Sequence, residues 1–429
     1  MILSYRVLSI FLYPLLIIFT YYRNFLNKED PKRFKEKIFT SHFKAFKKNN
    51  SKLVWFHAAS VGEFKSILPI LSKLNSKKKN LKFLITTTTL SSSNLAKIEL
   101  KNYTNVEHRF FPFDVPFLVN EFLYQWKPDR IFLVDSEIWP NLLFRAKQLK
   151  IPIALINARL TARSSNKWML FPKVAKKIFS TFDLCLCSNL ETKKFLEKLN
   201  VSNSYFKGNI KLIGKIDSDE ITNFNEDFLL NEKFWLAAST HPGEDFFCIM
   251  THLKIKQKFK DIKTFIAPRH IEKAKEIELL SLKHNLNTQI LNKNDKILKN
   301  KEIIIINYFG ELNNYFKYAD SVFIGKSMIK KLKDEGGQNP VEAAKLNCKI
   351  YHGPFVYNFK DIYRILEKNN ISKIVNNFEE LGKNLVKDFQ DQKDQKKNIS
   401  YKLENIADQT FVDTIKLVEN FLFNDDKQT

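Results

Sequence analysis

The residue best placed to do acid–base chemistry in this sequence is Glu63. An apolar run from Leu53 to Ala58 predicts a buried strand, and Phe64 to Leu74 has the spacing of a helix, so Gly62 is expected in a tight turn between them. Glu63 would then lie in the first helical turn, at the carboxyl end of a parallel strand, where open α/β sheets build their sites. A structural role is the alternative, because an acid in the first turn favours the positive end of the helix dipole.

Further charged residues follow the fourth and fifth apolar runs of the first half. Asp135 and Glu137 form an acid pair after the fourth run. Arg159 and Arg163 follow the fifth, and their spacing would put them on one helix face if that segment is helical. Only ten of the 70 basic residues are Arg, so two Arg kept so close together indicate bidentate recognition of phosphate or carboxylate. A pair of structural salt bridges is the alternative.

The second half of the chain has its own polar residues at the ends of apolar runs. Arg269 follows one run, and Gly325-Lys-Ser327 follows another. Within Gly336-Gly-Gln-Asn-Pro-Val-Glu342, Asn339 is a natural N-cap and Pro340 a first-turn residue of a helix. Two Gly directly before a helix leave its free N–H groups accessible to a phosphate.

Apolar runs alternate with amphipathic stretches in both halves, which predicts two Rossmann-like α/β domains facing a central cleft. With 429 residues and 44% hydrophobic content, the chain is large enough for both. The expected strands cover residues 53–58, 83–88, 106–111, 131–134, 153–156 and 184–188, then 234–238, 264–267, 303–306, 321–324 and 349–352. We expect a membrane anchor over 1–22, an N-terminal domain over 23–207, a C-terminal domain over 208–400 and a closing helix over 401–429.

Charge and cysteine content restrict the function classes. The net charge of +24 would ordinarily point to nucleic acid, an anionic membrane or an anionic substrate. Lys is abundant throughout, however, which indicates compositional drift and solvated lysine faces, and no nucleic-acid partner is expected. The four Cys form no disulfide framework, since Cys185 and Cys187 alternate within one strand as small core residues. No Gly-x-Gly-x-x-Gly or phosphate-loop lysine follows the first strand, which argues against dinucleotide oxidoreductases and phosphate-loop NTPases.

The N-terminal segment predicts an uncleaved membrane anchor. Val7 to Tyr22 is uncharged and slightly short of the roughly 20 residues that span a bilayer, so a short span and an interfacial helix both fit. Neither a basic leader nor a small-residue cleavage site is visible. Basic residues gather after the segment, which puts the body of the protein in the cytoplasm and against anionic lipid. These residues are Arg23, Lys28, Lys32, Arg33, Lys35 and Lys37.

Seven ordered motifs between about Tyr21 and Tyr357 resemble a known family. The motifs are Ala-Ala-Ser-Val-Gly-Glu63, Ser-Glu-Ile-Trp-Pro-Asn141, Asn-Ala-Arg-Leu-Thr-Ala-Arg-Ser164, Gly-Asn-Ile-Lys211, Ala-Ser-Thr-His-Pro-Gly-Glu244, Pro-Arg-His270 and Gly-Gly-Gln-Asn-Pro-Val-Glu-Ala343. In this order they are similar to 3-deoxy-D-manno-octulosonic acid (Kdo) transferases, the membrane-anchored glycosyltransferases that add Kdo to lipid A precursor.

The resemblance implies a GT-B fold, a CMP-Kdo donor, a lipid IVA acceptor and no metal or other cofactor. Transfer would proceed with inversion at the inner membrane, whose anionic lipids would hold the catalytic body on its cytoplasmic face. Glu63 would be the general base that takes the proton of the acceptor hydroxyl. The remaining implied roles are acceptor binding by Ser60, Glu137, Arg159 and Arg163, and donor binding by Pro268, Arg269, Gly325, Ser327, Gly337, Asn339 and Glu342.

Two departures from the family pattern affect the expected donor site. Lys326 stands where the family has Gly, and it could contact a phosphate or point away; Gln338 replaces a usual His. The Lys-rich insert from Ile329 to Glu335 is expected at the surface, with a mobile flap as the alternative. Two other functions stay open at this point: a non-catalytic protein that binds anionic lipid, and a sugar-nucleotide epimerase of similar architecture.

Overall fold

The computed structural model describes residues 2–45, 51–77, 80–214, 216–391 and 395–423. The chain divides into two compact units, the first made of Met1–Gly214 with Ala407–Thr429 and the second of Lys215–Ile406. This division falls a few residues after the expected domain boundary at Lys207. The end of the expected closing helix, residues 424–429, lies outside the described residues.

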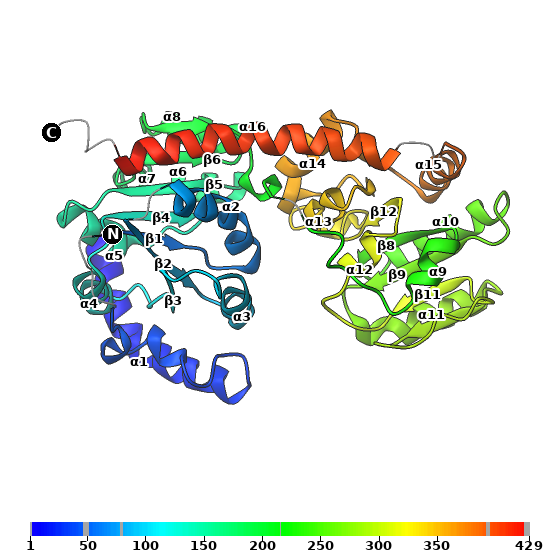
Figure 1. The fold of residues 1–429 in the computed structure, drawn as a ribbon, viewed down its shortest axis with the longest axis horizontal. Coiled ribbons are helices and arrows are strands. Elements are labelled where there is room, and N and C mark those ends of the chain that lie inside the picture. The colour runs from blue at the N-terminus through cyan, green and yellow to red at the C-terminus, as the bar shows by residue number, and fades with distance from the viewer. Residues whose placement is uncertain (1, 46–50, 78–79, 215, 392–394, 424–429) are drawn as a thin grey trace. The chain divides into compact units, whose positions relative to one another are not determined.

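The first unit is built on a parallel sheet with the strand order β3-β2-β1-β4-β5-β6-β7 (Figure 1). The six strands expected in this half are confirmed, and the structure adds a short edge strand, β7. The strands are β1 (Lys52–His57), β2 (Leu81–Thr87), β3 (Val106–Phe110), β4 (Arg130–Val134), β5 (Ile153–Ala158), β6 (Leu184–Cys187) and β7 (Ser204–Phe206).

Alternate residues of these strands enter two apolar cores, one on each face of the sheet. Trp55 of β1 belongs to one core, whereas Val54 and Phe56 of the same strand belong to the other. Cys185 and Cys187 are buried free thiols in the first of these cores, as expected. Both faces are therefore covered, which is the usual condition of a parallel sheet.

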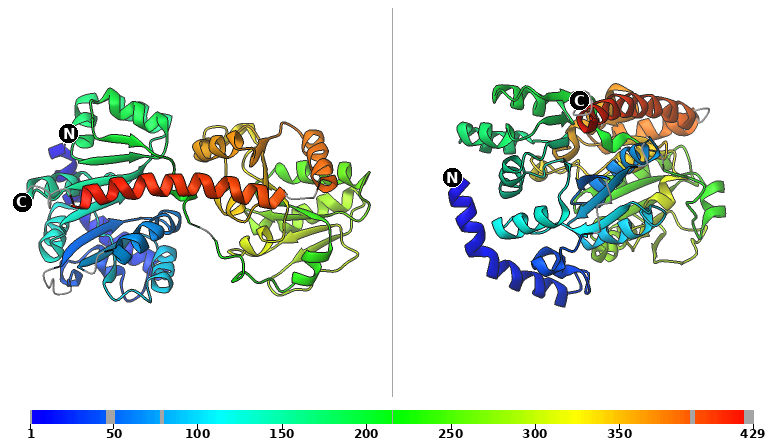
Figure 2. Two further views of the ribbon diagram at one scale, coloured as in Figure 1. Left: turned by 45° about the horizontal axis from the view of Figure 1, so that its top comes forward. Right: turned by 60° about the vertical axis from the view of Figure 1, so that its left-hand side comes forward.

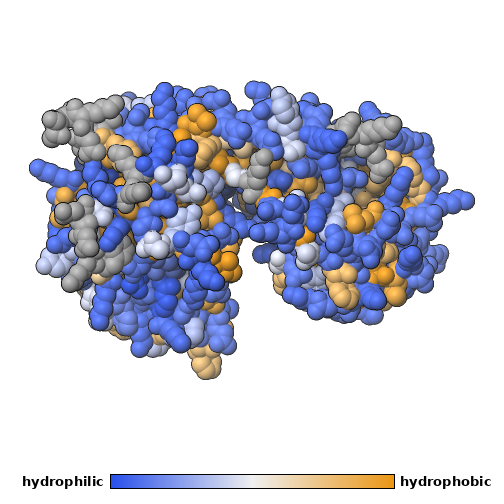
Figure 3. All heavy atoms as spheres, in the orientation of Figure 1, coloured by the Kyte–Doolittle hydropathy of each residue, from blue (hydrophilic) through white to orange (hydrophobic). Residues whose placement is uncertain are grey.

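The helices that cover the sheet follow the strands along the chain. They are α2 (Val61–Lys77), α3 (Leu90–Glu99), α4 (Pro116–Trp126), α5 (Pro140–Gln148), α6 (Ala162–Met169), α7 (Pro172–Phe179) and α8 (Leu190–Lys198), with 3-10 turns at Phe34–Lys37, Thr40–His42 and Ile210–Leu212. The face of the molecule drawn in Figure 3 is mostly hydrophilic, with apolar side chains in small groups.

The expected anchor is α1 (Ile2–Phe25), and one side of it is packed on the first unit. α1 contacts α4 and α5 and lies on the outside of this unit (Figure 2). The Tyr5 hydroxyl donates to Asp114 Oδ2 at 3.0 Å and the Tyr13 hydroxyl to the Ile38 carbonyl at 2.5 Å. The other side exposes apolar side chains, with Phe11 76% and Ile18 65% exposed. By length and composition α1 could also cross a membrane.

The second unit has a parallel sheet with the order β10-β11-β9-β8-β12-β13-β14. The five strands expected in this half are confirmed, and β10 and β14 at the two edges are additions. The strands are β8 (Phe234–Thr240), β9 (Lys263–Pro268), β10 (Thr288–Leu291), β11 (Ile303–Ile306), β12 (Ser321–Ile324), β13 (Lys349–His352) and β14 (Ser372–Ile374).

Helices also follow the strands of the second unit. They are α9 (Glu226–Asn231), α10 (Glu244–Lys256), α11 (Ala274–Lys283), α12 (Asn313–Phe316), α13 (Val341–Lys345), α14 (Lys360–Lys368) and α15 (Phe378–Gln390), with 3-10 turns at Ile271–Lys273, Lys330–Leu332 and Tyr357–Phe359. The last helix, α16 (Gln395–Phe423), contributes residues to both units.

Candidate functional site

In the first unit, Glu63 lies where the order of the strands reverses. The chain passes from β1 to β2 and β3 on one side and returns to β4 on the other side of β1. Loops that leave the carboxyl ends of two such strands diverge, and ligands bind in the space that this leaves. Glu63 comes shortly after β1, and Asp135 and Glu137 come directly after β4.

The carboxylate of Glu63 is held by the start of its own helix. Its Oε1 accepts from the Ser60 hydroxyl and its Oε2 from the Ala59 N–H, both at 2.8 Å, while the Glu63 N–H donates to Ser60 Oγ at 3.3 Å. This reciprocal pairing of Ser with a Glu three residues later is a capping-box arrangement. It starts α2 at Val61, so the expected tight turn at Gly62 is wrong and Gly62 is helical.

The surroundings of Glu63 make its carboxyl a stronger base than an exposed one. Burial raises its pKa above the ordinary value of 4.5, and the negative charges of Asp135 and Glu137 raise it further. The Ser60 hydrogen bond and the positive charge of Lys211 act in the opposite direction. Glu63 thus supports the start of its own helix, and its carboxyl also has the raised pKa that an acid–base role would use.

Glu137 is fixed by two ring nitrogens. Its Oε2 lies 3.1 Å from His57 Nε2 and accepts from the Trp139 indole N–H at 2.7 Å. His57 is fully buried, and its Nδ1 lies 3.0 Å from Thr86 Oγ1. Its ring stacks on Phe111 with a centroid distance of 3.8 Å. The position of the Glu137 carboxylate is therefore set by His57 of β1 and by Trp139, which directly precedes α5.

Asp135 is the centre of a polar network that the sequence did not assign. One carboxylate oxygen accepts from Asn157 Nδ2 at 2.9 Å, and the other pairs with Lys211 Nζ. Asn157 Oδ1 in turn accepts from the Ile210 N–H at 3.0 Å. Asp135 and Asn157 both have positive φ, 63° and 55°, at the ends of adjacent strands. Lys211 and Ile210 both belong to the Gly-Asn-Ile-Lys211 motif, but the sequence does not connect that motif with Asp135.

The two Arg of the first unit do not share a helix face. α6 begins at Ala162, with the Thr161 hydroxyl as its cap, so Arg163 is helical and exposed while Arg159 precedes the helix. The Arg159 N–H donates to the Asp135 carbonyl at 3.2 Å, and its own carbonyl accepts from the Ser136 hydroxyl at 2.6 Å. This backbone pairing across the ends of β4 and β5 delays the helix and places Arg159 next to Asp135.

In the second unit, the carboxylate of Glu244 organises the equivalent strand ends. The order reverses between β8 and β12, and Glu244 opens the helix after β8. Its Oε2 accepts from the N–H groups of His241 and Lys326 at 3.0 and 2.7 Å, and its Oε1 from those of Ser327 and Met328 at 2.8 and 2.9 Å. Four backbone donors on one buried carboxylate fix the loop after β12 to the end of β8.

Ser327, which the resemblance places at a phosphate, supports this loop from within. It is fully buried; its N–H donates to Glu244, and its hydroxyl donates to the Ile324 carbonyl at 2.7 Å and accepts from the Gly353 N–H at 2.9 Å. Close packing also explains the nearby glycines. A Cβ on Gly325 would lie 2.6 Å from the Ser239 carbonyl oxygen, and Gly337 has a φ of +87° beside Val356.

Four basic side chains gather at the ends of β8, β9 and β12. Arg269 is exposed directly after β9, and its N–H donates to the Thr240 carbonyl at 2.9 Å. His241 lies against His270, with ring centroids 5.6 Å apart. Burial lowers the pKa of His241, and the charges of Lys326, His270 and Arg269 lower it further. The sequence predicted a donor role for Arg269 and left one open for Lys326, whereas His241 and His270 received none although both stand in the seven motifs.

Three expected donor residues remain, one at the end of β9 and two around the start of α13. Pro268 is buried at the end of β9, and Asn339 is exposed before α13. Asn339 Oδ1 accepts from the Val341 N–H at 3.1 Å, but the N-cap of α13 is Pro340, which makes no side-chain cap bond, so the expected N-cap at Asn339 and the expected first-turn place of Pro340 are wrong by one residue. Glu342 is half-buried in the first turn. The insert from Ile329 to Glu335 is mostly exposed, as expected.

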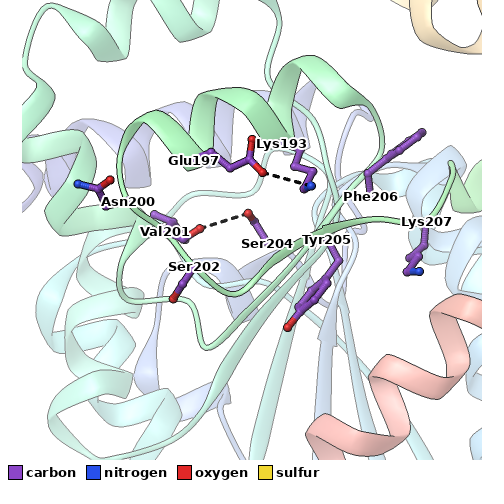
Figure 4. A pocket seen from close by; sticks show the side chains of 9 residues that line it. All are labelled: Lys193, Glu197, Asn200, Val201, Ser202, Ser204, Tyr205, Phe206 and Lys207. Atoms are coloured by element: carbon purple, nitrogen blue, oxygen red, sulfur yellow. Dashed lines mark hydrogen bonds and ion pairs between the residues drawn. The ribbon is translucent and has the colours of Figure 1, made fainter.

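A cavity of about 610 Å³ opens elsewhere in the first unit, beside the edge strand β7 (Figure 4). Lys193 and Glu197 of α8 line it and pair with each other at 3.2 Å, and Tyr205 and Phe206 of β7 line it as well. None of the expected site residues borders it. In the described part of the chain, no group of three or more His, Cys, Asp and Glu is arranged to hold a metal ion.

The fold is shared with sugar-nucleotide enzymes. UDP-GlcNAc 2-epimerase from Neisseria meningitidis aligns with a TM-score of 0.57 at 12% identity, covering 86% of this chain and 100% of that one. A glycosyltransferase from Rickettsia africae aligns with a TM-score of 0.57 at 11% identity, covering 88% and 100%. These likenesses support the expected GT-B fold, and the fold alone does not separate transferases from epimerases.

Sequence comparison distinguishes the transferases from the epimerases. Residues 32–213 match the family model described as 3-deoxy-D-manno-octulosonic-acid transferase (kdotransferase). A protein of Rickettsia bellii named 3-deoxy-D-manno-octulosonic acid transferase is 28% identical over 381 residues, covering 88% of each chain. A mitochondrial protein of Arabidopsis thaliana named for the same activity is 30% identical over 379 residues, covering 85% of this chain and 82% of that one. This chain therefore belongs to the 3-deoxy-D-manno-octulosonic acid (Kdo) transferase family.

Proposed function

We propose that this protein transfers Kdo from CMP-Kdo to a hydroxyl of the lipid A precursor lipid IVA, with inversion at the anomeric carbon. The observation that carries the mechanism is the carboxylate of Glu63, held at the strand-order reversal beside Asp135 and Glu137. A sugar hydroxyl is a poor nucleophile unless a positioned base accepts its proton in the transition state. Glu63, with its raised pKa, is that base.

The capping bonds of Glu63 are compatible with this role. Ala59 and Ser60 occupy one acceptor position on each carboxylate oxygen, and a carboxylate offers about four such positions in all. The bonds fix the orientation of the carboxylate before the acceptor arrives, which lowers the entropic cost of the reaction. The proton then passes from the acceptor hydroxyl to a free lone pair of Glu63 as the oxygen attacks.

For the acceptor we assign Ser60, Glu137, Arg159 and Arg163. Arg159 lies next to Asp135, and Arg163 is exposed on the same stretch of chain. Guanidinium groups match the planar geometry of phosphate and carboxylate, which a lipid A precursor and a growing Kdo chain would present. Glu137, held by His57 and Trp139, is an acceptor for sugar hydroxyls.

For the donor we assign the basic group at the ends of β8, β9 and β12, with Asn339 and Glu342 near the nucleotide. Arg269 and Lys326 neutralise the CMP phosphate as it leaves, so that charge stabilisation needs no cofactor. Pro268, Gly325, Gly337 and Ser327 shape the loops that carry these groups. Ser327 acts through the loop and makes no direct bond to the phosphate.

For the membrane we propose that α1 lies in the interface and does not span the bilayer. Its contacts with Asp114 and Ile38 hold it along the first unit, while Phe11, Leu15 and Ile18 are free to enter the lipid. Of the basic residues after α1, Lys37 is buried against Glu29 and Arg33 is paired with Glu36, so it is the exposed Lys28 and Lys32 that favour the anionic, cytoplasmic face of the inner membrane.

Changing Glu63 to Gln should leave the protein folded and able to bind CMP but remove most of the Kdo transfer. Loss of a general base typically costs 10²–10⁴-fold in rate. Transfer is measured with labelled CMP-Kdo and lipid IVA in detergent, and CMP binding by calorimetry. If Glu63→Gln retained more than about a hundredth of the activity, the assignment of Glu63 as general base would be contradicted. If the unchanged protein released a free epimerised sugar nucleotide as its product, the epimerase function would be favoured.

The charges around Glu63 should move the acid limb of the pH–rate profile in opposite directions. Activity requires the unprotonated base and falls as pH drops through the pKa of Glu63. Lys211 holds that pKa down and Asp135 holds it up, so Lys211→Gln should move the limb to higher pH and Asp135→Asn to lower pH. A limb that stays in place in both variants, or moves the same way in both, would assign it to another group.

Arg269→Lys should impair use of CMP-Kdo far more than use of the acceptor, because a point charge does not reproduce the planar fork on a phosphate. The measurement is KM and kcat for each substrate with the other saturating. Arg364→Lys, the same change at an exposed residue of α14 in the same unit, is the control and should change neither. Equal effects of Arg269→Lys on both substrates would move Arg269 out of the donor site.

Changing Phe11, Leu15 and Ile18 together to Gln should release the protein from vesicles and spare transfer to detergent-dispersed acceptor. Full burial of one such side chain is worth about 1.5–3 kcal/mol, so a loss of vesicle affinity above about a hundredfold is expected. Substitution is preferable to deletion of α1, which would also remove the Tyr5 and Tyr13 hydrogen bonds.

Ile98→Gln with Tyr124→Gln is the matched control, since both side chains are exposed and apolar in the same unit but lie outside α1. The orientation of α1 is tested with Leu3→Cys, because all four native Cys are buried. An interfacial α1 keeps this thiol on the cytoplasmic side. Labelling by a membrane-impermeant reagent from the periplasmic side would show that α1 spans the bilayer.

A further inference from the structure

A second cavity of the first unit, of about 360 Å³, lies where α1, α4 and α5 meet. Arg6 lines it from α1, Phe117 and Asn120 from α4, and Phe144, Arg145 and Gln148 from α5. Phe144, Arg145 and Gln148 lie on one face of α5, because residues three and four apart on a helix are neighbours. Pro116 and Asn141 complete the lining, which therefore combines two guanidinium groups, three amides and two aromatic rings.

The positive charge of this cavity is not balanced by the protein. Arg145 donates to Gln148 Oε1 at 3.3 Å, and its Nε is buried with no hydrogen-bond partner. Arg6 is the one charged residue in the sequence from 2 to 22. Among the described residues, no carboxylate pairs with either Arg. A buried donor without an acceptor is costly, and two like charges at one cavity repel, so an anion bound between them would be stabilising.

Exposed apolar side chains lie beside Arg6 on α1 and in the α4 part of the lining, and this apolar set is here called the rim. Leu3 and Ile10 lie one turn before and after Arg6 and are 72% and 48% exposed, and Phe117 is 42% exposed. A small inorganic anion would gain nothing from these side chains. A molecule with an anionic head and an apolar tail would use both the guanidinium groups and the rim.

We propose that this cavity binds the phosphate group of an anionic bilayer phospholipid, with Arg145 and Arg6 on the phosphate and an acyl chain along α1. The proposal rests on the membrane position proposed for α1, and it adds a specific lipid site to the general attraction of basic residues. The bound lipid would bridge α1 to α5 and fix the first unit on the bilayer surface. No residue assigned to the Glu63 site lines the cavity.

The test is binding of a soluble short-chain phosphatidylglycerol to the full-length protein in detergent, measured by calorimetry. Short-chain phosphatidylcholine, whose choline cation the two Arg would repel, and inorganic phosphate are the comparison ligands. Arg145→Gln and Arg6→Gln should each weaken phosphatidylglycerol binding at least about tenfold, as expected for loss of a charged hydrogen-bond donor. Arg145→Lys keeps the positive charge but cannot donate two parallel hydrogen bonds as a guanidinium does, so it should lose an intermediate amount of phosphatidylglycerol affinity.

Lys147→Gln is the matched control, because Lys147 lies on the same helix, is exposed and does not line the cavity. It should bind phosphatidylglycerol like the unchanged protein. Equal losses in Lys147→Gln and Arg145→Gln would reduce the effect to surface charge and overturn the site. Circular dichroism of each variant shows whether it is folded, and Arg145→Lys replaces Arg145→Gln if the latter is not.

Two other results would overturn the proposal by assigning the cavity to a different ligand. Inorganic phosphate that binds as tightly as phosphatidylglycerol would make this a free-phosphate site. A raised KM for lipid IVA in phospholipid-free detergent, caused by Arg145→Gln with phosphatidylglycerol binding unchanged, would assign the cavity to the acceptor. Glu63→Gln should bind phosphatidylglycerol normally although it is inactive, so failure of the lipid site and failure of the proposed transfer are separable.

Discussion

Parallel strand pairing is the constraint on which both candidate sites depend. It brings the carboxyl ends of β1 and β4, and of β8 and β12, to one edge of each sheet, with the order of strands reversing between them. A carboxylate buried at that edge loses its hydrogen bonds to water, and hydrogen bonds from the protein must replace them. Ala59 and Ser60 donate these bonds to Glu63, Asn157 and Lys211 donate them to Asp135, and four backbone N–H groups donate them to Glu244.

Local sequence determined what could be predicted and what could not. The central strands are continuous apolar runs and were predictable, whereas β7, β10 and β14 are short edge strands with partly exposed residues, whose pattern resembles that of loops. The position of Glu63 in the first turn of the helix after β1 was predictable because strand, cap and acid are contiguous. The pairing of Lys211 with Asp135 was not, since it joins residues far apart in sequence through a register that only the folded sheet sets.

The same long-range geometry changed individual roles. Ser327 follows a strand in a Gly-containing loop and looks like a phosphate ligand in sequence, yet Glu244, distant in the chain, takes its N–H. Arg159 and Arg163 have helical spacing, but the hydrogen bond from the Arg159 N–H to the Asp135 carbonyl holds Arg159 outside α6. In each case a contact from another strand end outweighs the local pattern, as tertiary context does generally.

α16 has a consequence for how the protein is made. Ile415, Val418 and Leu422, near the end of the chain, complete a core that β1, β2 and α2 form near its beginning. During translation the first unit emerges long before these residues do, and it must wait with part of its apolar surface uncovered. A segment translated after the whole second unit therefore closes the core of the first unit, and a chain truncated before Ile415 yields a first unit that lacks these three core side chains.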